Sequence, residues 1–255
     1  MELKTNNTKL AIVIPSCDNY SDLWEILVSQ MKSNFIGIDY NIYIVCNSNH
    51  KKKISDINYL NIGIDQGWSS NFKEALKLID EQYIFLWIDD LILLKKVDAN
   101  LFTNILNLFI KDEGNYLRFS IVPSSNKKFN NYYGEASINA LYRASTVMTI
   151  WKKDVLNDIL VLGENAWEFE INGSIRSKKY DKFFICYDPI FIFYNAVIKG
   201  KWNKKIKNSL INKYGYKIND VRKVMTFKEQ IYYDIKLYIS IYYYKIYNKI
   251  LIHFI

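Results

Sequence analysis

Residues 83–90, YIFLWIDD, decide how the rest of the chain is read. Six apolar or aromatic residues in a row predict a strand that is buried on both faces, and Asp89 and Asp90 follow where that strand should end. In an open α/β sheet, ligands bind outside the carboxyl ends of the strands. Two hard anions at that place suit a divalent cation that bridges to a phosphate. The stretch predicts a site for a metal and a nucleotide, and a helix cap or a solvated strand end is the plain alternative.

The chain before and after this stretch alternates between strand and helix patterns. Short apolar runs predict further strands at residues 9–15, 41–46, 59–62 and 116–122. Between them we expect a helix that begins at an Asp22–Glu25 capping box, a helix around residues 72–79, and a helix over residues 99–110 that Asp98 caps. The order β-α-β-β-α-β-α-β predicts an α/β fold, a Rossmann-like and mostly parallel sheet flanked by helices.

The second half of the chain is less regular. Residues 124–134 are polar and predict an exposed loop, residues 152–160 predict a short helix, and residues 183–194 are β-prone. Residues 163–170, GENAWEFE, carry three glutamates, for which the simplest interpretation is a solvated helix face.

Composition bounds the class of protein. With 255 residues, 50% of them hydrophobic, the chain can form a sizeable core, and disorder is excluded. Cys17, Cys46 and Cys186 lie far apart without metal-ligand spacing, which predicts buried free thiols in a reducing compartment. Residues 1–9 lack an apolar signal core, and no run reaches the length of about 18 apolar residues that a membrane span needs. We therefore expect a cytoplasmic protein.

The positive charge is concentrated in the C-terminal part. Residues 199–255 carry 13 Lys and Arg and three acidic residues, a net charge of +10 against +8 for the whole chain. This predicts two regions, residues 1–198 and a basic, aromatic extension of residues 199–255. Tyrosines and lysines favour the headgroup zone of an anionic membrane, so residues 227–255 predict an interfacial helix that would place the protein peripherally at the inner face. A helix packed on the body or on another subunit of an oligomer is the alternative.

Four segments together resemble GT-A glycosyltransferases, and in particular the family-2-like nucleotide-sugar transferases. They are IVIPSCDN at residues 12–19, GIDQGWSSNFKEAL at residues 63–76, YIFLWIDD with its DXD-like acidic end, and GENAWEFEINGSIRS at residues 163–177. The resemblance covers roughly residues 10 to 180, and it lies in the order and spacing of these segments. Residues 143–156, RASTVMTIWKKDVL, resemble a bacterial branch that builds surface polysaccharides.

The resemblance implies a role for individual residues. The nucleotide-sugar donor would lie against Pro15, Ser16, Asp18, Asp65, Gly67, Asp89 and Asp90. Asp90, and after it Asp89, would bind Mn²⁺ or Mg²⁺ on the diphosphate. Glu170 or Glu168 would be the general base that deprotonates a saccharide or lipid-linked saccharide acceptor.

The sequence departs from the family pattern in two places. Residues 46–48 read Cys-Asn-Ser where the group often has acidic residues, so the base contacts there are open. The acceptor segment reads Trp-Glu-Phe-Glu in place of adjacent Glu and Asp. Glu168 and Glu170 cannot point the same way, so only one of them serves as base, with Glu170 the first candidate. Arg176 is placed to pair with one of the glutamates or to reach a phosphate.

The expected chemistry explains these residue types. A departing nucleoside diphosphate develops charge that a bridging cation stabilises, and the acceptor hydroxyl needs a carboxylate to take its proton. In-line attack would invert the anomeric centre. Trp68 and Trp167 could stack on a sugar or pack in the core.

Three other functions remain as alternatives. A nucleic-acid binder would explain a pI of about 9.1, but the charge is confined to the extension and no nucleic acid is expected as partner. A metal-dependent nucleotidyltransferase would need a Gly-rich phosphate loop after the first strand, which the sequence lacks. A silent sugar-binding relative would not need the carboxylates.

Overall fold

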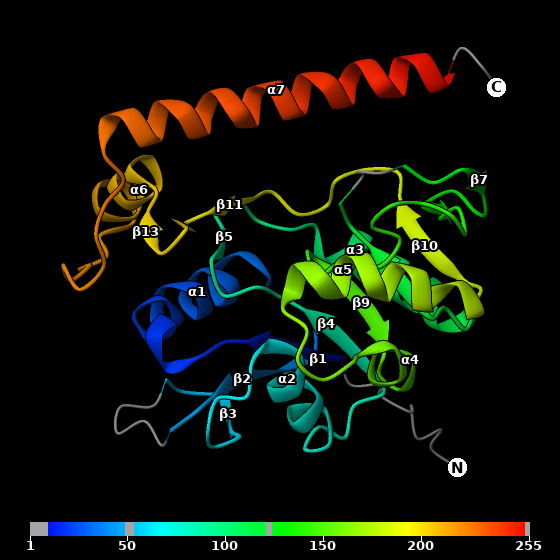
Figure 1. Ribbon diagram of the computed structural model, residues 1–255, viewed down its shortest axis with the longest axis horizontal. Helices are drawn as coiled ribbons and strands as arrows, with labels where there is room; N and C mark the ends of the chain where they lie inside the picture. Colours follow the sequence, from blue (N-terminus) through cyan, green and yellow to red (C-terminus); the bar gives the residue numbers. More distant parts are fainter. Residues whose placement is uncertain (1–9, 49–53, 121–123, 253–255) are drawn as a thin grey trace. The chain divides into compact units, whose positions relative to one another are not determined.

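The computed structural model describes residues 10–48, 54–120 and 124–252, and within residues 240–252 it describes only the Tyr242 side chain (Figure 1). The chain divides into two compact units. The first comprises residues 1–89 and 93–192, and the second comprises residues 90–92 and 193–255. Within the described residues, no helix combines the length and the hydropathy that crossing a membrane requires.

A nine-stranded sheet organises the first unit, in the order β3-β2-β1-β4-β9-β6-β10-β8-β7. Its strands are β1 (Leu10–Pro15), β2 (Tyr40–Cys46), β3 (Asn58–Asn61), β4 (Tyr83–Leu86), β6 (Tyr116–Arg118), β7 (Lys127–Lys128), β8 (Tyr133–Glu135), β9 (Thr149–Lys152) and β10 (Phe183–Cys186). Neighbours β3, β2, β1 and β4 are parallel, and so are β6 and β10, whereas β9 and β8 run antiparallel to their neighbours. The predicted α/β fold with a mostly parallel sheet is confirmed.

Helices cover both faces of this sheet (Figure 1). They are α1 (Ser21–Asn34), α2 (Trp68–Leu76), α3 (Ala99–Lys111), α4 (Lys153–Ile159) and α5 (Ala166–Arg176). Ala11, Val13, Ile84 and Leu86 belong to the core cluster that also contains side chains of α2, α4 and α5. Phe85 points to the other face, where its ring stacks on Phe102 of α3 at 6.0 Å between centroids. This alternation explains why residues 83–86 are apolar without interruption.

The central strands bring two distant loops together. β1 pairs in parallel with β4, with Leu10 opposite Tyr83 and Val13 opposite Leu86. The ladder continues one residue further, because Trp87 N donates to Val13 O at 3.0 Å. The loop after β1 and the turn that contains Asp89 therefore leave the same edge of the sheet side by side. The regular strand is shorter than the predicted one, since it ends at Leu86.

Of the two predicted helix caps, one is confirmed and the other is wrong. Asp98 caps α3 as expected, and its side chain accepts a hydrogen bond from Leu101 N at 3.0 Å. The Asp22–Glu25 capping box is wrong, because α1 begins at Ser21 with Tyr20 as the N-cap residue. Asp22 thus lies inside the first turn, where its charge suits the helix dipole.

The predicted loop at residues 124–134 contains part of the sheet instead. β7 and β8 form a hairpin there, and Tyr133 is fully buried. The Tyr133 hydroxyl donates to Asp112 Oδ2 at 2.6 Å. A Cβ on Gly134 would lie 2.4 Å from Lys127 O, so this close approach of two strands requires glycine. The polar composition hid a strand that is only three residues long.

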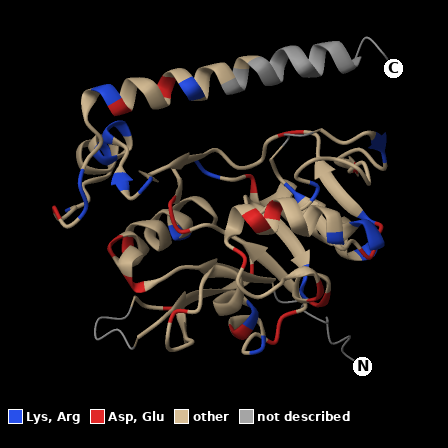
Figure 2. Ribbon diagram, in the orientation of Figure 1, with Lys and Arg blue, Asp and Glu red and all other residues tan. Residues whose placement is uncertain are grey.

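The second unit is small and basic. β5 (Leu91–Leu93) pairs with β11 (Phe193–Asn195), and a hairpin of β12 (Val197–Ile198) and β13 (Lys201–Trp202) follows. Two helices complete it, α6 (Lys204–Tyr214) and α7 (Phe227–Ile252). Figure 2 shows Lys and Arg recurring along β13, α6 and the beginning of α7. Asn203 caps α6, and the side chain of Trp202 beside it is fully buried.

Candidate functional site

A cavity of about 270 Å³ lies in the first unit, where the loop after β1 meets the start of α2 and the turn after β4. Its lining includes five of the residues that the resemblance assigns to the donor: Pro15, Ser16, Asp65, Gly67 and Asp89. These residues come from three separate segments of the chain. The cavity therefore gathers most of the predicted donor residues at the carboxyl ends of parallel strands, which is where open α/β sheets bind ligands.

Asp89 is held in place by the loop after β1. Its side chain is 8% exposed, and Oδ2 accepts a hydrogen bond from the Ser16 hydroxyl at 2.5 Å. Ser16 Oγ in turn accepts from the indole nitrogen of Trp24, on α1, at 2.8 Å. This chain of donors fixes the orientation of the carboxylate. Sequence reasoning missed Trp24, whose position on the apolar face of α1 indicated only core packing.

Asp65 shapes the second wall of the cavity. Its Oδ1 accepts from Gly67 N at 2.9 Å and from the side-chain amide of Asn71 at 2.7 Å. Gly67 is the N-cap residue of α2 and has a φ of 90°, a conformation that favours glycine. The turn is therefore rigid, and Asn71, which the sequence did not single out, sets its geometry.

Asp18 is placed beside the cavity rather than in its lining. Its Oδ1 accepts from Asn47 N at 2.9 Å and so joins the loop after β1 to the end of β2. Asn47 belongs to the segment that departs from the family pattern. The hydrogen bond from Asn47 N to Asp18 therefore holds the loop after β1 and the loop after β2 together.

Asp89 and Asp90 have different surroundings. Asp90 belongs to the second unit and is not among the residues that line the cavity. Its backbone oxygen accepts from Ala196 N at 2.8 Å. Burial raises the pKa of Asp90 to about 6, although the positive charge of Arg222 opposes the shift. Within the described ranges, no cluster of three or more His, Cys, Asp or Glu side chains could form a metal site by itself.

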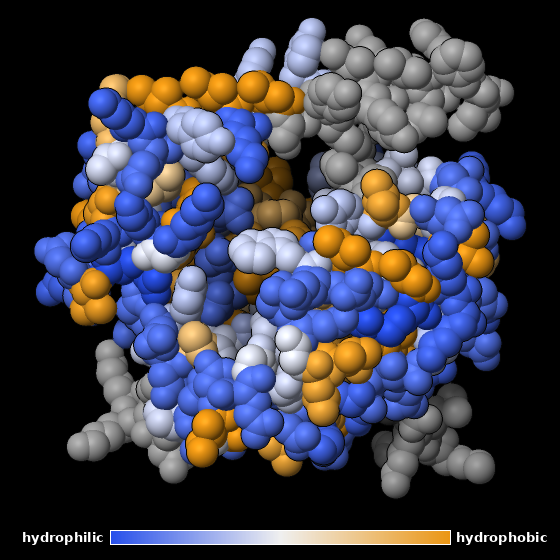
Figure 3. Space-filling view, in the orientation of Figure 1, coloured by the Kyte–Doolittle hydropathy of each residue, from blue (hydrophilic) through white to orange (hydrophobic). Residues whose placement is uncertain are grey.

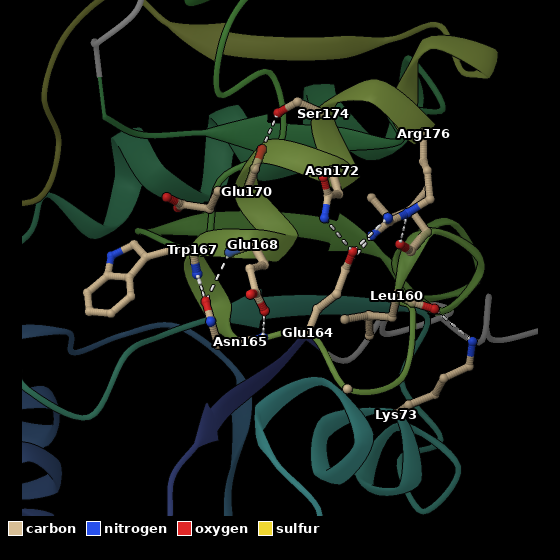
Figure 4. A network of polar contacts seen from close by, with 12 residues as sticks. Lys73, Leu160, Glu164, Asn165, Trp167, Glu168, Glu170, Asn172, Ser174 and Arg176 are labelled. Atoms are coloured by element: carbon tan, nitrogen blue, oxygen red, sulfur yellow. Dashed lines mark hydrogen bonds and ion pairs between the residues drawn. The ribbon is translucent and has the colours of Figure 1, made fainter.

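The side chains of the two candidate bases, Glu168 and Glu170, project from different sides of α5 (Figure 4). Glu168 is exposed, and its Oε2 accepts from Asn165 N at 2.9 Å, which completes a capping box. Glu170 is half-buried, and its Oε1 accepts from Ser145 Oγ at 2.8 Å, Thr146 N at 2.7 Å and Thr146 Oγ1 at 3.0 Å. Glu170 thus holds the segment before β9, whereas Glu168 keeps a carboxylate oxygen in solvent.

Arg176, whose partner the sequence did not decide, forms an ion pair with Glu164. Arg176 donates to both carboxylate oxygens of Glu164, at 2.9 Å from Nη1 and 2.5 Å from Nη2 (Figure 4). Burial acts to raise the pKa of Glu164, but hydrogen bonds from Arg176 and Asn172 outweigh it and hold the pKa below its usual range. The backbone oxygen of Glu164 accepts from Ser69 N at 3.2 Å, so this network fixes the start of α5 against α2.

The two tryptophans have different environments. Trp68 lines the cavity, and its ring also packs against Phe72 and Phe169, with centroids 5.6 Å and 5.4 Å away. Trp167 is 78% exposed, and its indole projects away from α5 (Figure 4). Core packing is therefore wrong for Trp167, because it occupies a solvent-facing position on the first turn of α5. A free aromatic face remains available there.

The prediction of buried thiols is confirmed for Cys46 and Cys186 and is wrong for Cys17, which is only half-buried. None of the three, all of which the structure describes, forms a disulfide, and Cys17 lines the cavity. Burial raises the pKa of Cys17 and of Cys186, so both thiols stay protonated at neutral pH.

The fold is similar to glycosyltransferase folds. The crystal structure of S. aureus TarS 1-349 matches with a TM-score of 0.51 and 11% sequence identity, over 73% of this chain and 60% of that chain. Its complex with UDP-GlcNAc matches with a TM-score of 0.52 and 10% identity over 76% of this chain, and its complex with UDP with the same TM-score and identity over 73%. The chain thus spans about three fifths of these structures. At this identity the likeness shows the fold.

No protein-family model matches the sequence. The comparison with curated proteins also returns no match.

Proposed function

We propose that the protein is a glycosyltransferase that moves a sugar from a nucleoside-diphosphate donor to a saccharide or a lipid-linked saccharide. One observation carries the proposal: Ser16, Asp65, Gly67 and Asp89 line a single cavity at the carboxyl ends of β1 and β4. The resemblance to GT-A glycosyltransferases implies that these same residues contact the donor. S. aureus TarS, which shares the fold, has been crystallised with UDP-GlcNAc and with UDP.

The cavity has the oxygen ligands that a hard cation needs. Asp89 and Asp65 supply carboxylates and Ser16 a hydroxyl, and Mg²⁺ or Mn²⁺ takes one or two carboxylates together with water and substrate phosphates. We assign Asp89 as the first ligand, because it lines the cavity and Ser16 fixes its orientation. Asp90 remains a second candidate. When bound, the cation would neutralise the charge that develops on the departing diphosphate.

The chain's own residues orient the donor. Pro15 and Ser16 would hold the nucleoside between the loop after β1 and the turn before α2, with Trp68 as an apolar wall. Asp65 is rigidly held by Gly67 and Asn71, so it can bind a hydroxyl or an amide of the donor without rearrangement.

Glu168 is the general base that the geometry favours over Glu170. Its carboxylate is exposed and accepts one capping hydrogen bond, whereas Oε1 of Glu170 already accepts three. A base in this position takes the proton of the acceptor hydroxyl during displacement, an effect worth about 10²- to 10⁴-fold in rate. In-line displacement at the anomeric carbon breaks the bond to the diphosphate as the bond to the acceptor oxygen forms, and it inverts the configuration. The resemblance of residues 143–156 to a surface-polysaccharide branch suggests such a pathway for the product.

A binding panel tests the proposal. Thermal unfolding is followed with Mn²⁺ and each of several nucleoside diphosphates, nucleotide sugars and nucleoside triphosphates. We expect stabilisation by one nucleoside-diphosphate family, lost in Asp89→Asn and kept in the matched control Asp39→Asn, an exposed residue outside the cavity. Stabilisation by triphosphates alone would favour a nucleotidyltransferase, and no response to any nucleotide would overturn the proposal.

A further inference from the structure

A second cavity, of about 530 Å³, lies entirely within the second unit. The β12–β13 hairpin and α7 both contribute to it. Its walls combine apolar side chains with lysines and tyrosines, among them Ile198, Met225, Leu237, Lys199, Lys236 and Tyr232. A cavity with this mixture suits a molecule that has an anionic head and an apolar body.

The lysines of this cavity differ in their pairing. Lys201 forms an ion pair with Glu229 at 2.5 Å. Lys199 and Lys236 have no acidic partner among the residues that the structure describes, and both are exposed. The two ammonium groups lie beside an apolar wall and are not neutralised by a described acidic side chain, so they can bind a phosphate.

The backbone holds one of these lysines in an uncommon conformation. Lys199 has a φ of 49° and is followed by Gly200 with a φ of 75°, and together they form the two-residue turn between β12 and β13. Such turns favour Asn-Gly, and a lysine at the first position destabilises the turn. The hairpin therefore places the Lys199 ammonium group at the cavity at the expense of local stability.

An exposed apolar stripe runs along α7 beside the cavity. It consists of Phe227, Ile231, Ile235, Tyr238, Ile239 and Tyr242, which recur at helical spacing and are 41–71% exposed. Figure 3 shows apolar side chains in a row along this part of the helix. Tyr232, which follows Ile231 of the stripe in the sequence, is 70% exposed and lines the cavity, so the stripe borders the cavity wall.

We propose that the second unit binds an anionic membrane lipid, with the lipid phosphate on Lys199 and Lys236 and the stripe of α7 in the headgroup zone. Charge decides between the possible occupants of the stripe. Residues 193–255 carry 13 basic and three acidic residues, so a second copy of this unit is repelled while an anionic bilayer is attracted. The aromatic and aliphatic side chains of the stripe suit the interface of a bilayer. This site is separate from the donor cavity and does not depend on the transferase reaction.

Sedimentation of the full chain with vesicles tests the proposal. One set of vesicles is phosphatidylcholine alone, and the other is equal parts of phosphatidylcholine and phosphatidylglycerol. The test variant is the double substitution Lys199→Gln/Lys236→Gln. Its matched control is Lys213→Gln/Lys217→Gln, which removes the same charge from exposed positions outside the cavity.

We expect binding to the anionic vesicles only. At about 1 kcal/mol for each lysine near the surface, the test variant should bind about 30-fold more weakly. The control should lose less than about threefold, because screening weakens charges that lie away from the lipid. Tyr232→Ser, which leaves the charge unchanged, should also weaken binding.

Three results would overturn the proposal. The first is an equal loss of binding in the test and control variants, and the second is binding that does not depend on phosphatidylglycerol. The third is release of the protein from the vesicles by inorganic phosphate under conditions where sulfate at the same ionic strength has no effect. The last result would mark a site for free phosphate. Unchanged thermal unfolding of each variant shows that it is folded, and unchanged stabilisation by nucleotide and Mn²⁺ separates this test from that of the transferase.

Discussion

The Ser16 hydroxyl donates a hydrogen bond to Oδ2 of Asp89 at 2.5 Å, although 73 positions separate the two residues in the chain. The pairing of β1 with β4 makes this contact possible, because the residues that follow two adjacent parallel strands leave the sheet together. The carboxylate is therefore oriented before any donor arrives.

Ser16→Ala should weaken the binding of nucleotide and Mn²⁺ and lower the free energy of unfolding by about 1–3 kcal/mol. The substitution removes the donor to Asp89 and leaves the buried indole N–H of Trp24 without its acceptor. Denaturant unfolding and nucleotide titration measure the two effects. Trp24→Phe is the comparison for nucleotide binding, since it removes the indole donor and ring volume but leaves the Ser16 hydroxyl on Asp89, so it should retain metal-dependent binding.

Glu168→Gln and Glu170→Gln should separate catalysis from stability. Glutamine also fits the third position of a capping box, so Glu168→Gln should leave unfolding nearly unchanged and lower kcat by about 10²- to 10⁴-fold. Glu170→Gln should weaken the bonds to Ser145 and Thr146 and lower stability by about 1 kcal/mol, with a smaller effect on kcat. The reverse pattern in kcat would assign the base to Glu170.

Arg176→Met should destabilise the protein by about 1–3 kcal/mol at neutral pH, because Glu164 would lose its bidentate partner. The pKa of Glu164 is lower in the folded state than usual, so the pair stabilises the fold above the ordinary pKa of the carboxyl and less as pH falls through the folded value. The difference between wild type and variant should therefore shrink in acid. Lys77→Met, which removes an exposed pair with Glu74, should change stability by less than about 1 kcal/mol at either pH.

Asp90→Asn should stabilise the protein at pH 8 and have little effect at pH 4. Burial raises the pKa of Asp90 to about 6, so the folded state favours the protonated form and loses stability as pH rises from the ordinary value through about 6. Asparagine stays neutral and avoids this loss. Urea unfolding of the wild type and the variant at the two pH values, without metal, measures the difference. Equal unfolding curves at pH 8 would refute the raised pKa of Asp90.

The first half of the fold could be predicted because its strands are uninterrupted apolar runs, such as residues 83–86, and its helices carry regular apolar spacing. The hairpin of β7 and β8 could not, since its strands are two and three residues long and mostly polar. Pairing with β10 and the close approach at Gly134 stabilise it, and both are tertiary effects.

The candidate site followed from the acidic end of residues 83–90 and from the resemblance to GT-A glycosyltransferases, and the cavity gathers five of the residues so assigned. The different surroundings of Asp89 and Asp90 could not be predicted, because adjacent letters carry no information on which compact unit each residue joins. Core packing was the wrong expectation for Trp167, although Trp167 stands beside glutamates in a segment that predicts a solvated helix face.

The route of the backbone limits how the protein can be divided. The chain enters the second unit at Asp90, returns to the first after Ile92, and enters the second again at Phe193. The short excursion supplies β5, whose partner strand β11 comes about a hundred residues later in the chain. A stop codon before Phe193 would leave β5 without that partner, and a fragment that starts at Phe193 would lack β5, so a single cut there cannot yield the second unit intact.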